Sequence, residues 1–347
     1  MVEISVIIPT YNVEKYIREC LDSAINQTFD DIEIICIDDN STDRTLDILN
    51  EYALKDSRIR VYQNDENKGI AYTRNLSLTL ANGKYIYFLD SDDFIELFAL
   101  ERLYNLVEEK SLDMIIFKLL NFKNHSRRKF KIPYTEMYYL ERRVGDRIFN
   151  FNDVIDLACE ICVNLQGKLF RRDLIQDIEF PNGYIFEDCP FFFEALIKAK
   201  RVYFLREHLC LKRDRKGSII TTHNEKYLDF IDMMFYTMDI AKKYEKYDEL
   251  KPYLFQYMIR FNLYQLVKLN PRISQLYFKK MKREYILHKN EIEEVYDDLY
   301  YKYQLTFNAC LKSDNYITFL IRICYLFLKN IKQTFREMKT ERKMWKP

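Results

Sequence analysis

The first 117 residues alternate between short β-branched runs and amphipathic stretches of helix length, and this alternation restricts the fold more than any other feature. Strands are predicted at 4–9, 32–38, 59–62, 84–90 and 112–117. Helical patterns separate them, around 16–24 and at 43–53, 70–80 and 97–109. Strands that alternate with helices of this length predict an α/β fold with a mostly parallel, doubly wound sheet that helices cover on both faces.

The strand signals stop near residue 225, and long helical patterns such as "PYLFQYMIRFNLYQLVKL" follow to the end of the chain. We therefore expect an α/β domain over residues 1–224 and a helical C-terminal region over 225–347. Residues 118–150 are polar, basic and irregular in pattern, and we interpret them as a variable insertion in the first domain.

Charge is balanced overall but unevenly distributed. The net charge of +1 gives no general basic field, so no nucleic-acid partner is expected. Residues 1–100 carry 9 Lys and Arg against 19 Asp and Glu, whereas residues 315–347 carry 8 against 2. The first 100 residues are therefore net acidic, and the last 33 are net basic.

The eight cysteines are interpreted as buried free thiols of a cytoplasmic protein. Their one close pair, Cys159 and Cys162, lies in the apolar pattern "VIDLACEIC", and no second pair or neighbouring His completes a zinc site. A metal or redox role for that pair is the alternative. The N-terminus shows no signal peptide, and no apolar run reaches the ~18–20 residues that span a bilayer.

Polar residues follow each of the first four predicted strands. They are Pro9-Thr10-Tyr11-Asn12, then Asp38-Asp39-Asn40-Ser41-Thr42-Asp43, then Asn64, Asn67-Lys68-Gly69 and Arg74, and finally Asp90-Ser91-Asp92-Asp93. Because ligands of doubly wound sheets bind beyond the carboxyl ends of the strands, we expect these groups to converge. Crowded carboxylates favour a shared Mg²⁺ or Mn²⁺, whose remaining positions water and substrate phosphates fill.

Each motif alone also has a structural interpretation. Residues 38–43 can form a turn with Ser41 or Thr42 capping the next helix, while 67–69 and 90–93 can be ordinary turns. Their joint occurrence after successive strands is what favours a binding site.

Four segments carry a family resemblance. "SVIIPTYN", "IDDNSTDRT", "ENKGIAYTRN" and "YIYFLDSDD" resemble the successive motifs of the family-2 glycosyltransferases, inverting enzymes with a GT-A-like domain that binds nucleotide-diphospho-sugars. The resemblance is dense over residues 3–120 and thinner over 164–222. It implies that the first domain is catalytic.

The resemblance implies roles for the polar strand ends. Pro9, Thr10 and Tyr11 would line the nucleoside pocket, Asp39 with Asp38 beside it would bind the base, Asn67 and Arg74 would contact the nucleotide, and Asp90 and Asp92 would form the metal motif. In that motif, Asp90 lies nearer the ribose and Asp92 binds Mn²⁺ or Mg²⁺. Asp93 receives no role.

Two later segments extend the resemblance. In "YIFEDCPFFFEA", Asp188 would be the general base with Glu187 beside it, although acids there can also simply favour a helix N-terminus. Lys168 would lie near the acceptor or the base. In "KRDRKGSIITTH", Arg213, Arg215 and Ser218 would close over the diphosphate. His223 is interpreted as a solvated loop residue, with a ligand or proton-shuttle role as the alternative.

The resemblance implies a hexosyl- or N-acetylhexosaminyltransferase of cell-envelope polysaccharide synthesis. It would use a metal and a nucleotide-sugar donor, with a UDP-sugar favoured, and a glycan, lipid-linked or polymer hydroxyl as acceptor. One alternative, a metal-dependent nucleotidyltransferase, lacks the expected Gly-rich, Lys-containing loop and gives Glu187 and Asp188 no task. Another, an inactive sugar-nucleotide sensor, should have lost the metal acid or the base, yet both positions are filled.

The end of the chain joins an apolar block at 316–328 to a basic tail. Thirteen residues interrupted by Arg322 are too short to span a membrane. The block can pack into the chain's own core or a homo-oligomer, or lie on anionic lipid at the inner face of the cell membrane. We favour packing, with the tail peripheral to the membrane.

Overall fold

The computed structural model describes residues 2–125, 128–133, 137–161, 163–214 and 224–330. Its contacts divide the chain into two compact units. The α/β unit comprises Met1–Val154 and Cys162–Lys216, and the helical unit comprises Ile155–Ile161 and Gly217–Pro347.

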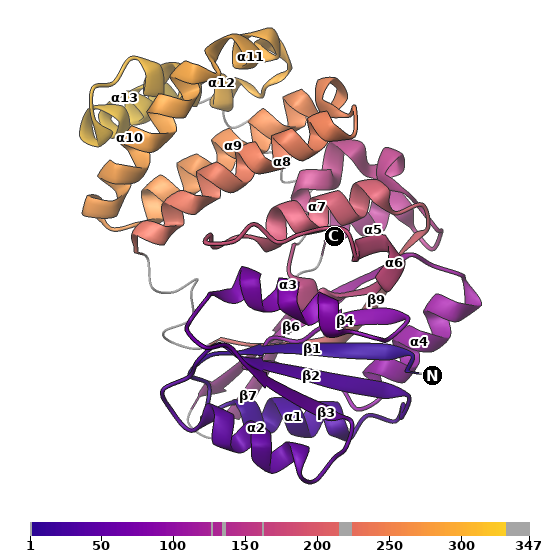
Figure 1. The fold of residues 1–347 in the computed structure, drawn as a ribbon. Coiled ribbons are helices and arrows are strands. Elements are labelled where there is room, and N and C mark those ends of the chain that lie inside the picture. Colours follow the sequence, from indigo (N-terminus) through magenta and orange to yellow (C-terminus); the bar gives the residue numbers. More distant parts are fainter. Residues whose placement is uncertain (1, 126–127, 134–136, 162, 215–223, 331–347) are drawn as a thin grey trace. The chain divides into compact units, whose positions relative to one another are not determined.

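Four parallel strands begin the α/β unit, as the alternating pattern predicts. They are β1 (Ile4–Thr10), β2 (Ile32–Asp38), β3 (Ile59–Gln63) and β4 (Tyr85–Phe88), in the order β3-β2-β1-β4. The helices between them are α1 (Ile17–Ile25), α2 (Thr45–Ala53) and α3 (Ile70–Leu80), with α4 (Ala99–Glu109) after β4. Figure 1 shows α3 on the opposite side of these strands from α1 and α2. Every residue of β1 and β2 is buried, as expected for central strands covered on both faces.

The rest of the sheet is mixed. Five more strands extend it: β5 (Phe94–Ile95), β6 (Met114–His125), β7 (Arg128–Pro133), β8 (Lys168–Arg171) and β9 (Val202–Arg213). β8 pairs antiparallel with β4 and β6, β6 pairs parallel with β9, and β5 pairs antiparallel with β9. The α/β class is therefore confirmed, and the parallel part carries the predicted strand ends.

Residues 118–150 are more regular than the sequence predicts. β6 continues through 118–125 and forms an antiparallel ladder with β7, and α5 (Tyr138–Val144) follows. The prediction of an irregular segment was wrong because a β-hairpin is held by its backbone ladder and tolerates a basic composition that hides the apolar alternation. Residues 202–213 form one continuous strand, β9, which pairs with β6 across an irregularity near Lys118.

Short elements connect these strands. They are the 3₁₀ helices η1 (Phe151–Glu160) and η2 (Leu165–Gly167), and the helices α6 (Arg172–Ile175) and α7 (Asp188–Lys198). The predicted cap of α2 was wrong: Arg44 stands at the N-cap position without a side-chain cap. Asp43 instead accepts a hydrogen bond from the Thr45 backbone N–H at 2.9 Å, so the capping acid lies next to the helix.

The helical unit contains long helices, as predicted beyond residue 225. They are α8 (Asp229–Lys243), α9 (Tyr247–Lys268), α10 (Pro271–Leu287), α11 (Lys289–Glu294), α12 (Tyr301–Leu311) and α13 (Tyr316–Lys329), with the 3₁₀ turns η4 (Glu225–Leu228) and η5 (Tyr296–Asp298). A buried amide organises its core: Asn262 accepts from the Tyr277 hydroxyl at 2.6 Å and donates to Tyr285 at 3.1 Å. No helix in the described ranges has the length and hydropathy to cross a membrane.

The cysteines within the described ranges are free thiols. Cys20, Cys36, Cys210 and Cys310 are buried, Cys159 and Cys189 are partly exposed, and Cys324 is exposed. Cys162, the partner of Cys159 in the close pair, lies outside the described residues. Four of the seven cysteines in the described ranges are therefore buried as predicted, and the exposed Cys324 departs from that prediction.

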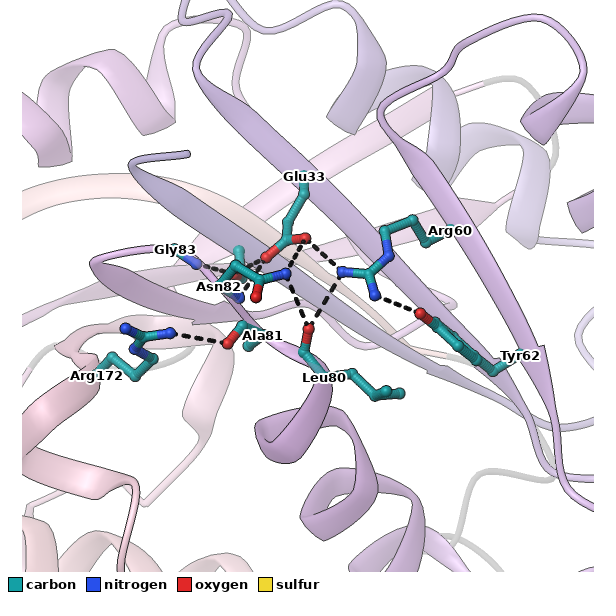
Figure 2. A network of polar contacts seen from close by, with 9 residues as sticks. Glu33, Arg60, Tyr62, Leu80, Ala81, Asn82, Gly83 and Arg172 are labelled. Carbon is teal, nitrogen blue, oxygen red and sulfur yellow. Dashed lines mark hydrogen bonds and ion pairs between the residues drawn. The ribbon is translucent and has the colours of Figure 1, made fainter. Parts of the chain in front are cut away.

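A buried carboxylate ties together the amino ends of the parallel strands. Glu33 of β2 accepts hydrogen bonds from the Ser5 hydroxyl at 2.6 Å and the Asn82 backbone N–H at 2.6 Å, and pairs with Arg60 at 2.7 Å. Figure 2 shows Glu33 between Asn82 and Arg60, with Arg60 also directed at Tyr62. Burial raises the pKa of Glu33, but these hydrogen bonds outweigh it and lower that pKa below its ordinary value.

Replacing this carboxylate should destabilise the α/β unit. Glu33→Ala leaves the Asn82 N–H and the Arg60 guanidinium without their acceptor, so we expect the free energy of unfolding to fall by about 2–4 kcal/mol in urea titrations. Because the folded-state pKa is lowered, the difference from wild type should shrink as pH falls through that pKa. Glu51→Ala, which removes an exposed carboxylate paired with Arg18, is the control. An equal loss in both variants would contradict a special role for Glu33.

Candidate functional site

The predicted polar residues meet at the carboxyl edge of the parallel strands. Thr10 lies opposite Asp38 in the ladder of β1 and β2, and Ile7 lies opposite Phe88 in that of β1 and β4. The residues that follow β4 therefore continue beside the end of β1. Since β3 pairs with β2 in parallel, its following loop reaches the same edge.

The loops after β1 and β2 are hydrogen-bonded to each other. Asn12, in a left-handed conformation with φ 51°, donates its backbone N–H to the Ser41 hydroxyl at 2.9 Å and accepts from the Thr42 N–H at 2.8 Å. Thr45 accepts from the Val13 N–H at 2.8 Å. The serine and threonines of "IDDNSTDRT" thus hold the first loop in place. Tyr11 remains 47% exposed beside them, where a ring can contact a ligand.

Asp39 organises the loop after β3. Its Oδ1 accepts from Asn64 Nδ2 at 2.7 Å and from the Lys68 backbone N–H at 2.8 Å, and its Oδ2 accepts from the Gly69 N–H at 2.8 Å. Gly69 has φ +86°, which favours glycine at the N-cap of α3. The carboxylate therefore fixes the start of α3 and still has acceptor capacity on Oδ2.

The remaining predicted nucleotide residues lie at this edge with different exposure. Asp38 is fully buried, and its oxygens accept from the Ser41 N–H at 2.9 Å and, weakly, from Thr10 at 3.5 Å. Pro9 is buried in β1, whereas Asn67 is exposed. Asp38 is thus placed to support the loop, and of these residues only Asn67 is exposed.

The three acids after β4 relieve their mutual repulsion in different ways. Asp90 pairs with Arg74 at 3.0 Å and accepts from Gln166 Nε2 at 3.1 Å. Asp93 is buried, and it accepts from Gln166 at 3.1 Å and from the Arg213 backbone N–H at 2.6 Å. Burial raises the pKa of Asp93 to about 8, well above the ordinary value of an aspartate. Asp92 stays partly exposed.

Arg74 joins the acids after β4 to the acids of α7. This buried side chain of α3 contacts Glu187 at 2.5 Å through Nη1 and Asp90 at 3.0 Å through Nη2, and its guanidinium lies 5.6 Å from the Phe180 ring centre. Glu187 stands at the N-cap position of α7 without making a side-chain cap. Its carboxylate pairs with Arg74, and a favourable interaction of both acids with the helix N-terminus stays an alternative.

Asp188 is the first residue of α7 and is partly exposed. Burial raises its pKa, the positive charges of Arg74, Lys168 and Lys212 oppose that rise, and the negative charge of Asp90 adds to it. A carboxylate with a raised pKa accepts a proton more readily than an ordinary one. The charge of Asp90 and that of its partner Arg74 therefore both affect the pKa of Asp188.

Lys168 and Arg213 are already engaged within the unit. Lys168 is buried, donates to the Asn164 carbonyl at 2.7 Å and lies 4.3 Å from the Phe192 ring centre. Arg213 donates to the Asp92 carbonyl at 3.0 Å, pairs with Glu19, and contacts the rings of Tyr16, Phe94 and Phe122. Arg213 therefore supports the turn of the acids. Arg215, Ser218 and His223 lie outside the described residues.

Two residues escaped prediction. Gln166 bonds Asp90 and Asp93 together, and Lys212 is a cation close to both Asp93 and Asp188. Both lie beside residues that the resemblance singles out, Lys168 and Arg213. Their position directly before or at the end of a strand was the signal that could have identified them.

The acids suit a metal that the substrate helps to bind. In the described ranges no group of three His, Cys, Asp or Glu side chains could enclose a metal ion. Mg²⁺ is typically held by one or two carboxylates together with substrate phosphates, and Mn²⁺ also prefers hard oxygen ligands. Asp92, with Asp90 two residues away, provides that smaller set, so the residues present fit such a metal.

Known proteins are similar to this chain in sequence. The sequence model described as "Glycosyl transferase family 2" matches residues 5–176. Glycosyltransferase GlyG of Streptococcus pneumoniae serotype 4 is 32% identical over 229 residues, which cover 63% of this chain and 73% of GlyG.

The chain belongs to glycosyl transferase family 2. It is thus a glycosyltransferase, and the nucleotidyltransferase alternative is set aside. The poly(ribitol-phosphate) beta-glucosyltransferase of Bacillus spizizenii is 37% identical over 208 residues, 58% of this chain and 30% of that relative. This glycosyltransferase therefore spans less than a third of that longer protein, and its relatives include enzymes of polymer glycosylation.

Solved structures share the fold. S. aureus TarS 1-349 in complex with UDP-GlcNAc has a TM-score of 0.71 at 22% identity, over 91% of this chain and 89% of that one. The GT-A-like fold predicted for this family-2 enzyme is thereby confirmed.

Proposed function

We propose that the chain is an inverting, metal-dependent glycosyltransferase that moves a sugar from a nucleotide-diphosphate donor, with a UDP-sugar favoured, to a hydroxyl of a glycan, lipid-linked or polymer acceptor. The observation that carries this proposal is the Arg74 bridge. It joins Asp90, on the donor side, to Glu187, next to Asp188. This buried cation supports a single site for the donor acids and the candidate base.

Asp188 is the base in this proposal. Its carboxylate takes the proton of the acceptor hydroxyl as that oxygen forms a bond to the anomeric carbon, while the bond from that carbon to the diphosphate oxygen breaks. One displacement inverts the anomeric configuration, and the bond electrons leave with the nucleoside diphosphate. Lys168 and Lys212 lower the cost of a negative charge at Asp188 before the proton arrives.

The donor binds along the strand ends in this proposal. Asp39 accepts from a base N–H through the remaining capacity of Oδ2, and the exposed Tyr11 ring covers the nucleoside. Asp90, held by Arg74 and Gln166, faces the ribose. Asn67, Arg215 and Ser218 complete the donor contacts by resemblance alone.

Asp92, assisted by Asp90, would hold Mn²⁺ or Mg²⁺. When bound, the metal neutralises charge that develops on the leaving diphosphate. Gln166 donates hydrogen bonds to both Asp90 and Asp93, which supports the turn that carries Asp92.

The relatives support the choice of substrates. TarS was crystallised with UDP-GlcNAc, and a second relative is named for glucosyl transfer to poly(ribitol-phosphate). A UDP-sugar and an envelope polymer are therefore the first donor and acceptor to test. Residues 1–224 would supply catalysis and 225–347 a separate helical region.

Incubation with UDP-, GDP- and dTDP-sugars, with and without Mn²⁺, tests the proposal through slow release of nucleoside diphosphate. We expect one donor to be hydrolysed only with metal, and Asp92→Ala to lose both hydrolysis and metal-dependent donor binding in calorimetry. Asp65→Ala, an exposed aspartate paired with Lys68, is the control. Tight binding of one donor without hydrolysis would favour the sensor, and unchanged binding in Asp92→Ala would reject the metal role.

The rate of sugar transfer should decrease at low pH. Burial raises the pKa of Glu187 to about 7 against the opposing charge of Arg74, and burial raises that of Asp188 as well. Because a protonated carboxyl cannot act as base, kcat/KM should decline as pH falls through the raised pKa of Asp188 and should be higher above it. Glu187→Gln removes a negative charge next to Asp188, which should lower the pKa of Asp188. The decline of kcat/KM should therefore occur at lower pH in this variant. A flat profile between about pH 5 and 8 would contradict the assignment.

A further inference from the structure

The last described helix, α13, is firmly attached to the helical unit by one side only. Its side chains Phe319 and Ile323 are buried, and the Phe319 ring centre lies 5.3 Å from that of Phe278 in α10. Asn315 and Thr318 form a capping box at its start, and the Tyr316 hydroxyl donates to the Leu266 carbonyl at 2.7 Å. The orientation of the helix about its own axis is thereby fixed.

The opposite side of α13 exposes large apolar side chains. Ile317, Ile321, Tyr325 and Leu328 are 66%, 66%, 61% and 69% exposed. Their spacing of four, four and three residues places them on one helix face, which we call the outer face. Contiguous exposed apolar surface of this kind marks an interaction site, whereas scattered exposed residues do not.

Cations accompany the outer face. Arg322 and Lys329 of α13 are exposed, and the helix sequence "YITFLIRICYLFLK" contains no acidic residue. The sequence that follows, 331–347, carries six Lys and Arg against two Glu, and it includes the chain's single tryptophan, Trp345. Apolar side chains next to basic ones are complementary to a surface with an apolar interior and anionic head groups.

We propose that the outer face of α13 binds the surface of an anionic phospholipid bilayer, with the helix lying in the plane of the interface. The apolar side chains enter the head-group boundary, and Arg322 and Lys329 contact lipid phosphates. A helix of 14 residues is too short to cross a bilayer, which agrees with binding along the surface. A second copy of the chain is a poorer occupant, because paired outer faces would bring cations together without a carboxylate from either helix.

Flotation of the full chain with vesicles tests this proposal. The vesicles are phosphatidylcholine with roughly 30 mol% phosphatidylglycerol, compared with phosphatidylcholine alone. We expect binding to the anionic vesicles, and a loss of roughly tenfold or more in Ile317→Ser/Ile321→Ser/Leu328→Ser. Arg322→Glu/Lys329→Glu should weaken binding to anionic vesicles and leave the weak binding to neutral ones unchanged.

The matched control replaces equally exposed residues of the same unit. Val267, Ile286 and Leu287 are 70%, 54% and 68% exposed and lie on α9 and α10, so Val267→Ser/Ile286→Ser/Leu287→Ser should bind vesicles like wild type. Equal flotation of wild type and the α13 triple variant would overturn the proposal. So would light scattering that shows, without lipid, a dimer that the α13 variant loses. None of these measurements depends on catalysis, so they stand apart from the proposed activity.

Discussion

Asp188→Asn is expected to reduce sugar transfer by roughly 10²–10⁴-fold, the range that a positioned general base contributes. An amide of the same shape keeps the start of α7 intact but cannot take the acceptor proton. Donor binding should survive, because the donor contacts proposed here come from residues of other segments. Initial rates with a saturating donor and calorimetry with the corresponding nucleoside diphosphate measure the two effects separately.

Asp173→Asn provides the matched comparison for this variant. Asp173 is also an acid in the first turn of a helix, α6, in the same unit, but its side chain is exposed. Its substitution should leave the transfer rate within about twofold of wild type, since it belongs to no charge network that reaches the acceptor. Full transfer activity in Asp188→Asn would remove Asp188 as the base.

Arg74→Leu should have the largest effect on folding. The substitution leaves Glu187 and Asp90 without the cation that pairs them, in a region where burial already raises the pKa of Glu187 to about 7. Breaking a buried ion pair from one side typically costs about 3–5 kcal/mol of unfolding free energy. We expect a loss of that size in urea denaturation, together with loss of transfer activity.

Two further variants test whether the loss of stability in Arg74→Leu comes from the unpaired buried acid. In Arg74→Leu/Glu187→Leu the unpaired acid is also removed, so part of the stability should return while activity stays low. Arg102→Leu breaks a pair with Glu207 in which both side chains are 40% exposed, and it should cost less than about 1 kcal/mol. Similar losses in Arg74→Leu and Arg102→Leu would show that burial of the Arg74 bridge is unimportant.

The N-terminal half of the fold was predictable because each element there has its own local signal. β1 and β2 are continuous apolar runs, and α1 and α4 bury one face each. The later half was harder, because β8 and β9 join the sheet through pairings between distant residues such as Tyr85 and Arg171. The hairpin of β6 and β7 was missed because its strands are basic and depend on the backbone ladder.

The site was predicted as a set of positions and only partly as a set of contacts. Motif order places Asp39, Asp90 and Asp188 at one edge, but it does not indicate that Arg74 links two of the motifs or that Gln166 holds two acids. Asp93 is the clearest example of a property that sequence motifs do not predict. Its raised pKa depends on burial against β9, which lies more than a hundred residues along the chain.

The carboxylate of Glu33 has a consequence for redesign of this enzyme. Its hydrogen bonds connect the amino ends of β1 and β2 to Asn82, just before β4, and Figure 2 shows Glu33 beside Asn82. The donor residues proposed here follow the carboxyl ends of the same strands. The loops that follow the carboxyl ends of the strands can therefore be exchanged with those of a relative that uses another sugar nucleotide. The hydrogen bonds of Glu33 at the amino ends of the strands would stay unchanged. Chimeras that keep Ser5, Glu33, Arg60 and Asn82 should tolerate such grafts best.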